Sequence, residues 1–315
     1  MRRHLAIARI RGLAAPGARL PGWHRPATLA AALVAAAIGG TVAPVAPVAP
    51  VAAEDTPRVM SLNVCTDQLV LALAKPERIV SLSMLSDDPD FSYLRAEARA
   101  FPKNAGVAEE VLIARPDVVV TGTYSLHNTT QLLRHLGMRV EEFGYTQTLD
   151  TIPGDIRRMG AILGQQARAE TMASAFESEL TALTLHAETP RPTAIIFGQN
   201  GVATGAGTLA DSVLSAAGFR NLAAERGLSG LAPYPLELLV IDRPDVVLLS
   251  ARIEGAPALA DQVTRHPAIS ASGAVAATGV VPRGSWGCGG PFTLEAVRAL
   301  RALRDDLLAR KGASG

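Results

Sequence analysis

The stretch Glu109–Val119 reads EEVLIARPDVV, and Glu237–Val247 reads ELLVIDRPDVV. In both, a Glu lies seven residues before the proline of an Arg-Pro-Asp-Val-Val run. The apolar positions predict a helix that faces a sheet, the proline predicts an extended turn at the arginine before it, and the paired valines predict a buried strand. One helix–turn–strand unit, present twice in the same register, indicates a chain with two halves built on one plan.

Outward from each copy, short β-rich runs alternate with helical patterns. This alternation predicts α/β layering around a mainly parallel sheet. Hydrophobic residues make up 48% of the chain, which is enough for two cores in 315 residues. Strands are predicted over 58–62, 78–83, 117–121, 138–143, 194–197 and 245–249, and helices over 66–73, 127–136, 209–217 and 293–308.

Between the two halves, Asp150–His186 shows helical periodicity and no strand pattern, and two prolines follow it. We therefore predict an α/β fold with two Rossmann-like lobes joined by a long bridging helix. A continuous helix resists bending, so only a modest hinge motion between the lobes is expected. The predicted parts are an N-terminal lobe over 54–149, a bridging helical segment over 150–189 and a C-terminal lobe over 190–315.

Residues 1–53 predict a signal peptide followed by a linker. They carry six arginines and no acidic residue, an apolar run over Leu29–Ile38, and the small residues Val51-Ala52-Ala53 at a suitable cleavage position. The apolar run, about ten residues, is too short to span a bilayer. The rest of the chain keeps 24 of the 30 basic residues against all 29 acidic ones, so nucleic acid is not an expected partner.

Several stretches together resemble one family. They include TLDTIPGDIRRMGAILG (Thr148–Gly164), GTLADSVLSAAGFRNLA (Gly207–Ala223) and the PDVVV strand that ends in Thr121-Gly122-Thr123. Over Arg58–Leu308 their order and spacing resemble the periplasmic binding proteins of the cobalamin and iron-siderophore importers. The resemblance implies a monomeric periplasmic protein that captures an iron complex (siderophore or heme) or cobalamin and delivers it to an ABC permease dimer with its ATPase subunits.

The same resemblance implies that Glu109 and Glu237 dock on the permease, one glutamate per lobe. A carboxylate accepts paired hydrogen bonds from a guanidinium, and two separated pairs fix orientation on a two-fold partner. The alternative is a solvated helix face, where glutamate is common. Glu110, the neighbour of Glu109, is a second candidate for the first docking position.

The ligand is expected at the loops that follow the strand ends, where open α/β sheets bind ligands. Trp286 lies between two glycines in such a loop, and its indole offers a flat apolar platform for a ring system, although ordinary packing also accounts for a tryptophan there. The predicted ligand contacts are Asn63, Cys65, Thr66, Met84, Ser86, Tyr124, Tyr145, Asn200, Arg252 and Trp286.

The sequence predicts no catalytic residue, no metal site of the protein's own and no cofactor, because the metal is expected to arrive within the ligand. Cys65 and Cys288 leave three interpretations open: a disulfide between lobes, a metal site, or two buried thiols, the last being favoured because it is common for cysteine. Tyr124 and His127 as direct metal ligands are the less favoured interpretation.

Two other functions remain open. A receptor for free zinc or manganese shares the helix-bridged fold, but its site takes several histidines, and only four lie beyond residue 53. An exported α/β enzyme is the alternative from another class. The stretch Gly205–Ala210 matches a dinucleotide-loop pattern but lies mid-chain and lacks a suitably placed acidic residue, and no nucleophile elbow is present.

Overall fold

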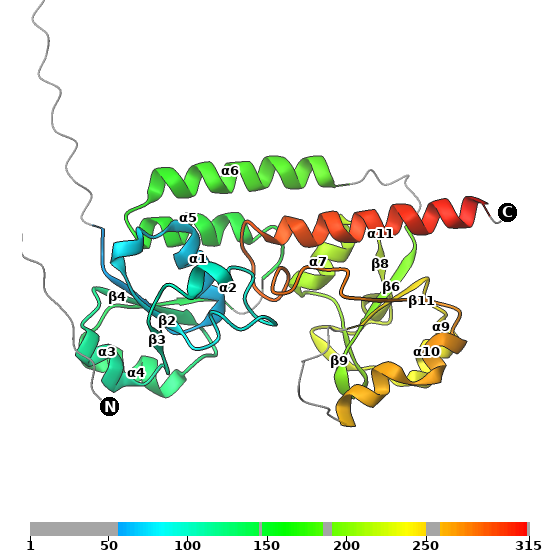
Figure 1. Cartoon of the computed structure of the whole chain (residues 1–315), viewed down its shortest axis with the longest axis horizontal. Coiled ribbons are helices and arrows are strands. Elements are labelled where there is room, and N and C mark those ends of the chain that lie inside the picture. Colours follow the sequence, from blue (N-terminus) through cyan, green and yellow to red (C-terminus); the bar gives the residue numbers. More distant parts are fainter. Residues whose placement is uncertain (1–55, 145–146, 185–190, 250–258, 314–315) are drawn as a thin grey trace, which may run out of the picture. The chain divides into compact units, whose positions relative to one another are not determined.

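The computed structural model describes residues 56–144, 147–184, 191–249 and 259–313 (Figure 1). The predicted signal peptide and linker over 1–53 therefore lies outside the described residues. In the described parts of the chain, no helix has the length and apolar character that crossing a membrane requires. The strands form two separate sheets.

The first sheet contains five parallel strands in the order β3-β2-β1-β4-β5. Val118, Val119 and Val120 of β4 are fully buried, as expected of a central strand in a parallel sheet. The strands and helices predicted up to residue 143 are confirmed. The elements are β1 (Val59–Ser61), α1 (Val64–Leu73), β2 (Ile79–Ser83), α2 (Arg95–Ala98), β3 (Lys103–Asn104), α3 (Ala108–Ala114), β4 (Val118–Gly122), α4 (His127–His135) and β5 (Val140–Phe143).

The second sheet is mixed. Its path is β11-β10-β6-β7-β9, with β8 paired to β6; β6, β8, β10 and β11 run parallel, whereas β7 and β9 are antiparallel to their neighbours. The predicted strands and helices of this half are confirmed, and the antiparallel pair was not predicted. The elements are β6 (Thr193–Phe197), β7 (Val202–Thr204), α7 (Leu209–Ala216), β8 (Arg220–Asn221), α8 (Leu222–Glu225), β9 (Leu231–Pro233), α9 (Leu236–Asp242), β10 (Val246–Leu249), α10 (Pro267–Ala271), β11 (Val275–Thr278) and α11 (Thr293–Ala313).

The repeated unit has the same backbone in both sheets. Arg115 ends α3 with φ 47° and ψ 59°, and Arg243 ends α9 with φ 45° and ψ 61°. The prediction of an extended arginine is therefore wrong. Proline disfavours the right-handed helical conformation for the residue before it, and these arginines avoid that conformation by adopting the left-handed one instead of the extended one. In this conformation the arginine N–H still caps the helix, donating to Val111 O at 2.9 Å and to Leu239 O at 3.2 Å.

The aspartate after each proline ties its strand to a neighbour. Asp117 Oδ2 accepts the N–H of Arg58, just before β1, at 2.7 Å. Asp245 Oδ2 accepts the N–H of Thr193, the first residue of β6, also at 2.7 Å. The repeated Arg-Pro-Asp therefore ends a helix and aligns the next strand with the first strand of its sheet.

The segment between the halves contains two helices rather than one continuous helix. Gly164 has φ 64°, and Gln165 N–H donates to Gly160 O at 2.7 Å, so the first helix ends in a left-handed glycine turn. The second helix runs back alongside the first (Figure 1), and a Cβ added at Gly160 would lie 2.1 Å from that of Ala169. Gly160 thus permits the close approach. The two helices are α5 (Ile152–Ile162) and α6 (Gln166–Leu183).

This helical pair shares a core with both sheets. One continuous cluster of buried apolar residues includes Val118 of β4, Ile156 of α5, Phe176 of α6, Ile196 of β6 and Leu300 of α11. The segment predicted as one stiff helix is therefore a pair of packed helices that shares a core with α11, and the modest hinge motion stays a prediction. The predicted domain boundaries remain a prediction.

Candidate functional site

The first sheet reverses its strand order between β1 and β4, because the chain runs outward from β1 to β3 and then returns past β1 to β4. Ligands bind open α/β sheets at the carboxyl ends of the strands beside such a reversal. Asn63 follows β1, and its Nδ2 donates to Oγ of Ser125, which follows β4, at 2.7 Å. Asn63 Oδ1 also accepts the Cys65 N–H at 2.9 Å as the N-cap of α1. Asn63 is therefore held in place at the reversal.

Large side chains stand in solvent in the loops after β2 and β4. Tyr124 is 81% exposed and Met84 is 65% exposed. Leu85 and Phe91, in the same loop as Met84, are about half exposed and were not predicted. The signal for Phe91 was an aromatic residue in a polar loop, SDDPDF, where no periodicity assigns it to a core. Met84 and Tyr124 lie just after the carboxyl ends of β2 and β4, and exposed apolar side chains of this size suit contact with an apolar surface.

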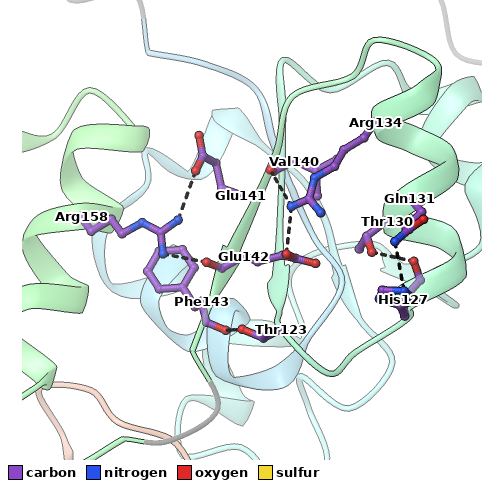
Figure 2. Close-up of polar contacts among 10 residues, drawn as sticks. All are labelled: Thr123, His127, Thr130, Gln131, Arg134, Val140, Glu141, Glu142, Phe143 and Arg158. Carbon is purple, nitrogen blue, oxygen red and sulfur yellow. Dashed lines mark hydrogen bonds and ion pairs between the residues drawn. The ribbon is translucent and has the colours of Figure 1, made fainter.

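The loop that carries Tyr124 starts from a fixed point (Figure 2). Thr123 donates its backbone N–H and its Oγ1 to Phe143 O, at 2.9 and 2.8 Å. Arg158 of α5 lies over the Phe143 ring, 4.5 Å from its centroid, and donates to Glu142 O at 2.7 Å. A guanidinium over an aromatic face is attracted by the ring quadrupole. These contacts fasten the ends of β4 and β5 to α5.

Two predicted ligand contacts are interior residues. Thr66 is 1% exposed, and its Oγ1 donates to Asn63 O at 3.0 Å and lies 2.8 Å from Ser61 Oγ. Ser86 is fully buried, and its N–H donates to Ser83 O at 3.0 Å. Thr66 in the first turn of α1 and Ser86 in the loop after β2 thus have their hydroxyls turned inward, and contact of either residue with a ligand stays a prediction.

Cys65 and Cys288 form a disulfide with their Cα atoms 5.0 Å apart. The favoured interpretation of two buried thiols is wrong, and the Cys65 sulfur is not free for a ligand. The two cysteines lie 223 residues apart in the chain, and only the fold brings the first turn of α1 beside the loop before α11.

That loop packs on the first half of the molecule at further points. Gly289 N–H donates to Gln147 Oε1 at 2.7 Å, and the rings of Tyr93 and Phe292 stack with centroids 4.9 Å apart. The disulfide therefore reinforces an existing packing contact.

The remaining predicted contacts have different positions. Trp286 lies in the same loop, is partly buried and packs against the main core cluster, so packing accounts for part of its surface. Asn200 is exposed, with φ 58°, in the tight turn between β6 and β7. Tyr145 and Arg252 lie outside the described residues. For Trp286 and Asn200, ligand contact stays a prediction.

Asp67 was not predicted and lies buried in α1. It accepts the N–H of Ser83 at 3.1 Å and the Ser83 hydroxyl at 2.5 Å, which ties α1 to the end of β2. Burial raises the pKa of the Asp67 carboxyl to about 6, although its hydrogen bonds to Ser83 and the charge of Lys103 act in the opposite direction. The only sequence signal was an aspartate within the helical pattern predicted over 66–73.

Each glutamate predicted to dock is exposed on its helix, Glu109 on α3 and Glu237 on α9. No described residue forms a hydrogen bond or ion pair with either carboxylate. Glu110, in contrast, accepts the N–H of Ala105 at 2.8 Å and so ties the loop before α3 to the first turn of the helix. The local role of Glu110 favours Glu109 as the first docking residue.

The described residues contain no group of three or more His, Cys, Asp or Glu side chains placed to hold a metal ion. His127 is exposed and lies 3.1 Å from the side-chain nitrogen of Gln131, and His135 Nδ1 lies 2.8 Å from Gln131 O. Both histidines thus have local partners on α4.

The family model described as "Periplasmic binding protein" matches residues 59–282. Two curated relatives from strains of Halobacterium salinarum, each named cobalamin-binding protein, are 23% identical over 229 residues, which is 71% of this chain and 62% of theirs. The chain thus spans less than two thirds of the length of these relatives.

Three solved structures share the fold. They are a periplasmic heme-binding protein from Roseiflexus sp. RS-1 (22% identity, TM-score 0.62, 80% of this chain and 98% of that one), a periplasmic vitamin B12 binding protein from Vibrio cholerae (18%, 0.60, 80% and 98%), and an ABC-type Fe3+-hydroxamate transport system from Saccharomonospora viridis (19%, 0.57, 78% and 93%). The predicted two-lobe α/β fold is confirmed by these likenesses.

Proposed function

Because the chain belongs to the periplasmic binding protein family, we propose that it captures one bulky metal-containing ligand and delivers it to the permease of an ABC importer. The ligand is an iron complex, either a siderophore or heme, or it is cobalamin. An iron complex is favoured from the sequence, and the names of the relatives and structural neighbours cover all three chemistries.

The carboxyl edge of the first sheet is the observation that carries this proposal. Asn63 is fixed at the strand-order reversal, and Tyr124 and Met84 present large exposed surfaces in the adjoining loops. A rigid polar group beside exposed aromatic and apolar side chains suits a large ring system that carries a few polar substituents. Asn200, in the turn after β6, is the proposed contact from the second half.

The protein is proposed to act by binding alone, with no reaction on the ligand and no cofactor of its own. The metal is proposed to enter with the ligand. Export to the periplasm is part of the proposal and rests on the Arg-bearing segment and apolar run within residues 1–53. The monomeric state is proposed from the family resemblance alone.

Ligand titration tests the binding function. The chain has two tryptophans, Trp23 and Trp286, so the full-length Trp23→Phe variant reports on Trp286 alone. We expect saturable quenching by one of hemin, cyanocobalamin or a ferric hydroxamate, and a weaker affinity in the Tyr124→Ala variant. Absence of quenching by all three, with tight Zn²⁺ or Mn²⁺ binding instead, would favour a receptor for free metal.

Docking is tested separately in the intact importer. Glu109→Gln and Glu237→Gln should each lower ligand uptake while the affinity of the purified chain for its ligand stays unchanged, because both carboxylates are exposed and neither has a described partner. Uptake that persists in the double variant would remove the docking role and leave the binding function standing.

A further inference from the structure

The helix face that carries Glu109 also leaves two aliphatic side chains in solvent. Leu112 and Ile113 follow Glu109 by three and four residues, so all three lie on one face of α3. Leu112 is 42% exposed, and Ile113 is 82% exposed. In contrast, Val111 on the opposite face is fully buried.

The second copy repeats this surface. Val240 and Ile241 follow Glu237 by the same spacing on α9 and are 37% and 70% exposed, and Leu239, at the place of Val111, is fully buried. Burial classes agree at every position from the glutamate to the proline of the two copies. The left-handed arginines that end both helices give the two surfaces the same backbone frame.

Single exposed apolar residues are common and need no explanation. A β-branched aliphatic residue left largely in solvent at the same place in both copies, four residues after an exposed carboxylate, is a repeated feature rather than scatter. Neither surface is covered within the described part of the chain. Burying such a side chain in a partner gains free energy that its solvent-exposed state does not provide.

We propose that Glu109 with Leu112 and Ile113, and Glu237 with Val240 and Ile241, form two matching docking surfaces for the permease, one for each of its two subunits. The proposal rests on the proposed function and extends it from two carboxylates to two mixed surfaces. A surface made twice on one chain fits a partner that presents the same receiving site twice. Each subunit then offers a cationic side chain for the carboxylate, next to an aliphatic patch for the isoleucine.

The two components of each surface respond differently to salt. Carboxylate–cation attraction weakens as ionic strength rises, because counter-ions screen exposed charges. Burial of the aliphatic side chains does not depend on that screening. Ile113 and Ile241 therefore account for docking that persists at high salt, and Glu109 and Glu237 account for the part that salt removes.

The test measures binding of the fluorescently labelled full-length chain to membrane vesicles that contain the intact importer, at about 50 and about 500 mM NaCl. Ile113→Ser and Ile241→Ser should each weaken binding by about ten-fold at both salt concentrations. Glu109→Gln and Glu237→Gln should weaken it at low salt and have little effect at high salt. Leu231→Ser is the matched control, because Leu231 is 68% exposed but lies outside the repeated unit, and it should leave binding unchanged.

The outcomes separate the two proposals. If the glutamate variants weaken binding and the isoleucine variants do not, the mixed surface is wrong while glutamate docking stands. If neither pair has an effect, docking through these helices fails altogether. If Leu231→Ser weakens binding as much as Ile241→Ser, or if the isoleucine variants instead abolish association between copies of this chain, the assignment of the surface to the permease is wrong. Unchanged urea midpoints for all variants verify that each one folds.

Discussion

The two copies of the repeated unit share a backbone, but opposite charges hold the ends of their helices. At the end of α3, the guanidinium of Arg58 donates to the Arg115 carbonyl oxygen at 2.8 Å. At the end of α9, Asp242 accepts Arg226 Nε–H at 2.8 Å and the hydroxyl of Tyr234. The Arg226 guanidinium holds the pKa of the Asp242 carboxyl below its usual range. The shared Arg-Pro-Asp therefore determines the backbone of both copies, whereas the side chains that contact the two helix ends are different.

The surroundings of the two copies also differ. The first sheet is all parallel and is linked by a disulfide to the loop before α11, whereas the second turns back into an antiparallel pair directly after β6. The first edge exposes Tyr124 and Met84, and the second exposes the polar Asn200 in its tight turn. The same repeated backbone thus lies beside an apolar, aromatic edge in the first half and a polar edge in the second. Two such edges suit the proposed ligand, a ring system with polar substituents.

The disulfide, which joins the first sheet to the loop before α11, has the largest expected effect on stability. Replacing both cysteines by alanine, Cys65→Ala with Cys288→Ala, should lower the free energy of unfolding by about 4 kcal/mol, because the link closes a long loop in the unfolded chain. Urea unfolding with and without dithiothreitol measures this. The double variant is its own control, since reductant should not change its stability; equal stability of the native chain in both conditions would contradict the prediction.

Asp67, in the first half, should make the free energy of unfolding depend on pH. Its folded pKa of about 6 lies above the value near 3.9 expected in the unfolded chain, so its stabilising contribution is complete below about pH 4 and is lost as pH rises through about 6. The native chain should lose up to about 3 kcal/mol relative to Asp67→Asn between pH 4 and 7. The measurement is the difference between their unfolding free energies across that range.

Ser83→Ala sharpens this prediction. Loss of the Ser83 hydroxyl removes a hydrogen bond that favours the charged form of Asp67 and so raises its folded pKa further. The pH range over which the native chain loses stability should therefore extend to higher pH. The nearest counterpart in the second half, Asp211 in the first turn of α7, is only half buried and accepts Asn221 Nδ2–H at 2.9 Å. A pH range unchanged by Ser83→Ala would mean that Asp67 is not its source.

Substitution of the aspartate in each copy of the repeat allows the stability contributions of the two copies to be compared directly. Asp245→Ala should cost about 2 kcal/mol and Asp117→Ala about 1 kcal/mol, because Asp245 accepts the Thr193 N–H and hydroxyl and also pairs with Lys311, whereas Asp117 accepts the Arg58 N–H. Chemical denaturation of both variants measures the costs. A larger cost at Asp117 would reverse the order that the contacts predict.

The smallest expected effect is a difference in how salt changes the stability cost of removing Asp242 at the end of α9 and Arg58 at the end of α3. Asp242→Asn replaces a charged anchor and should cost about 1 kcal/mol at low salt and less at high salt, because the Arg226 guanidinium is partly exposed. Arg58→Met removes donors to neutral carbonyl groups, so its cost should depend less on salt. Denaturation in low and high NaCl compares them; equal salt dependence would contradict the assignment of opposite anchors.

Periodicity and the repeated motif predicted the two-lobe fold, because local patterns determine helices, strands and the ends of strands. The break at Gly164 was visible as a Leu-Gly pair, yet apolar positions continue on both sides of it and resemble one helix. The disulfide and the buried Thr66 and Ser86 depend on which loops meet in space. Sequence spacing does not contain that information, so neither the disulfide nor the direction of these side chains could be predicted from it.

Native mass spectrometry of the full-length chain, titrated with hemin, cyanocobalamin and a ferric hydroxamate, measures whether the two halves form one ligand site. We expect one ligand molecule per chain for one of these compounds, with occupancy reduced in both Tyr124→Ala and Asn200→Ala, because each half is proposed to contribute to the same site. Two ligands lost independently in the two variants, or an unchanged mass with all three compounds, would contradict it.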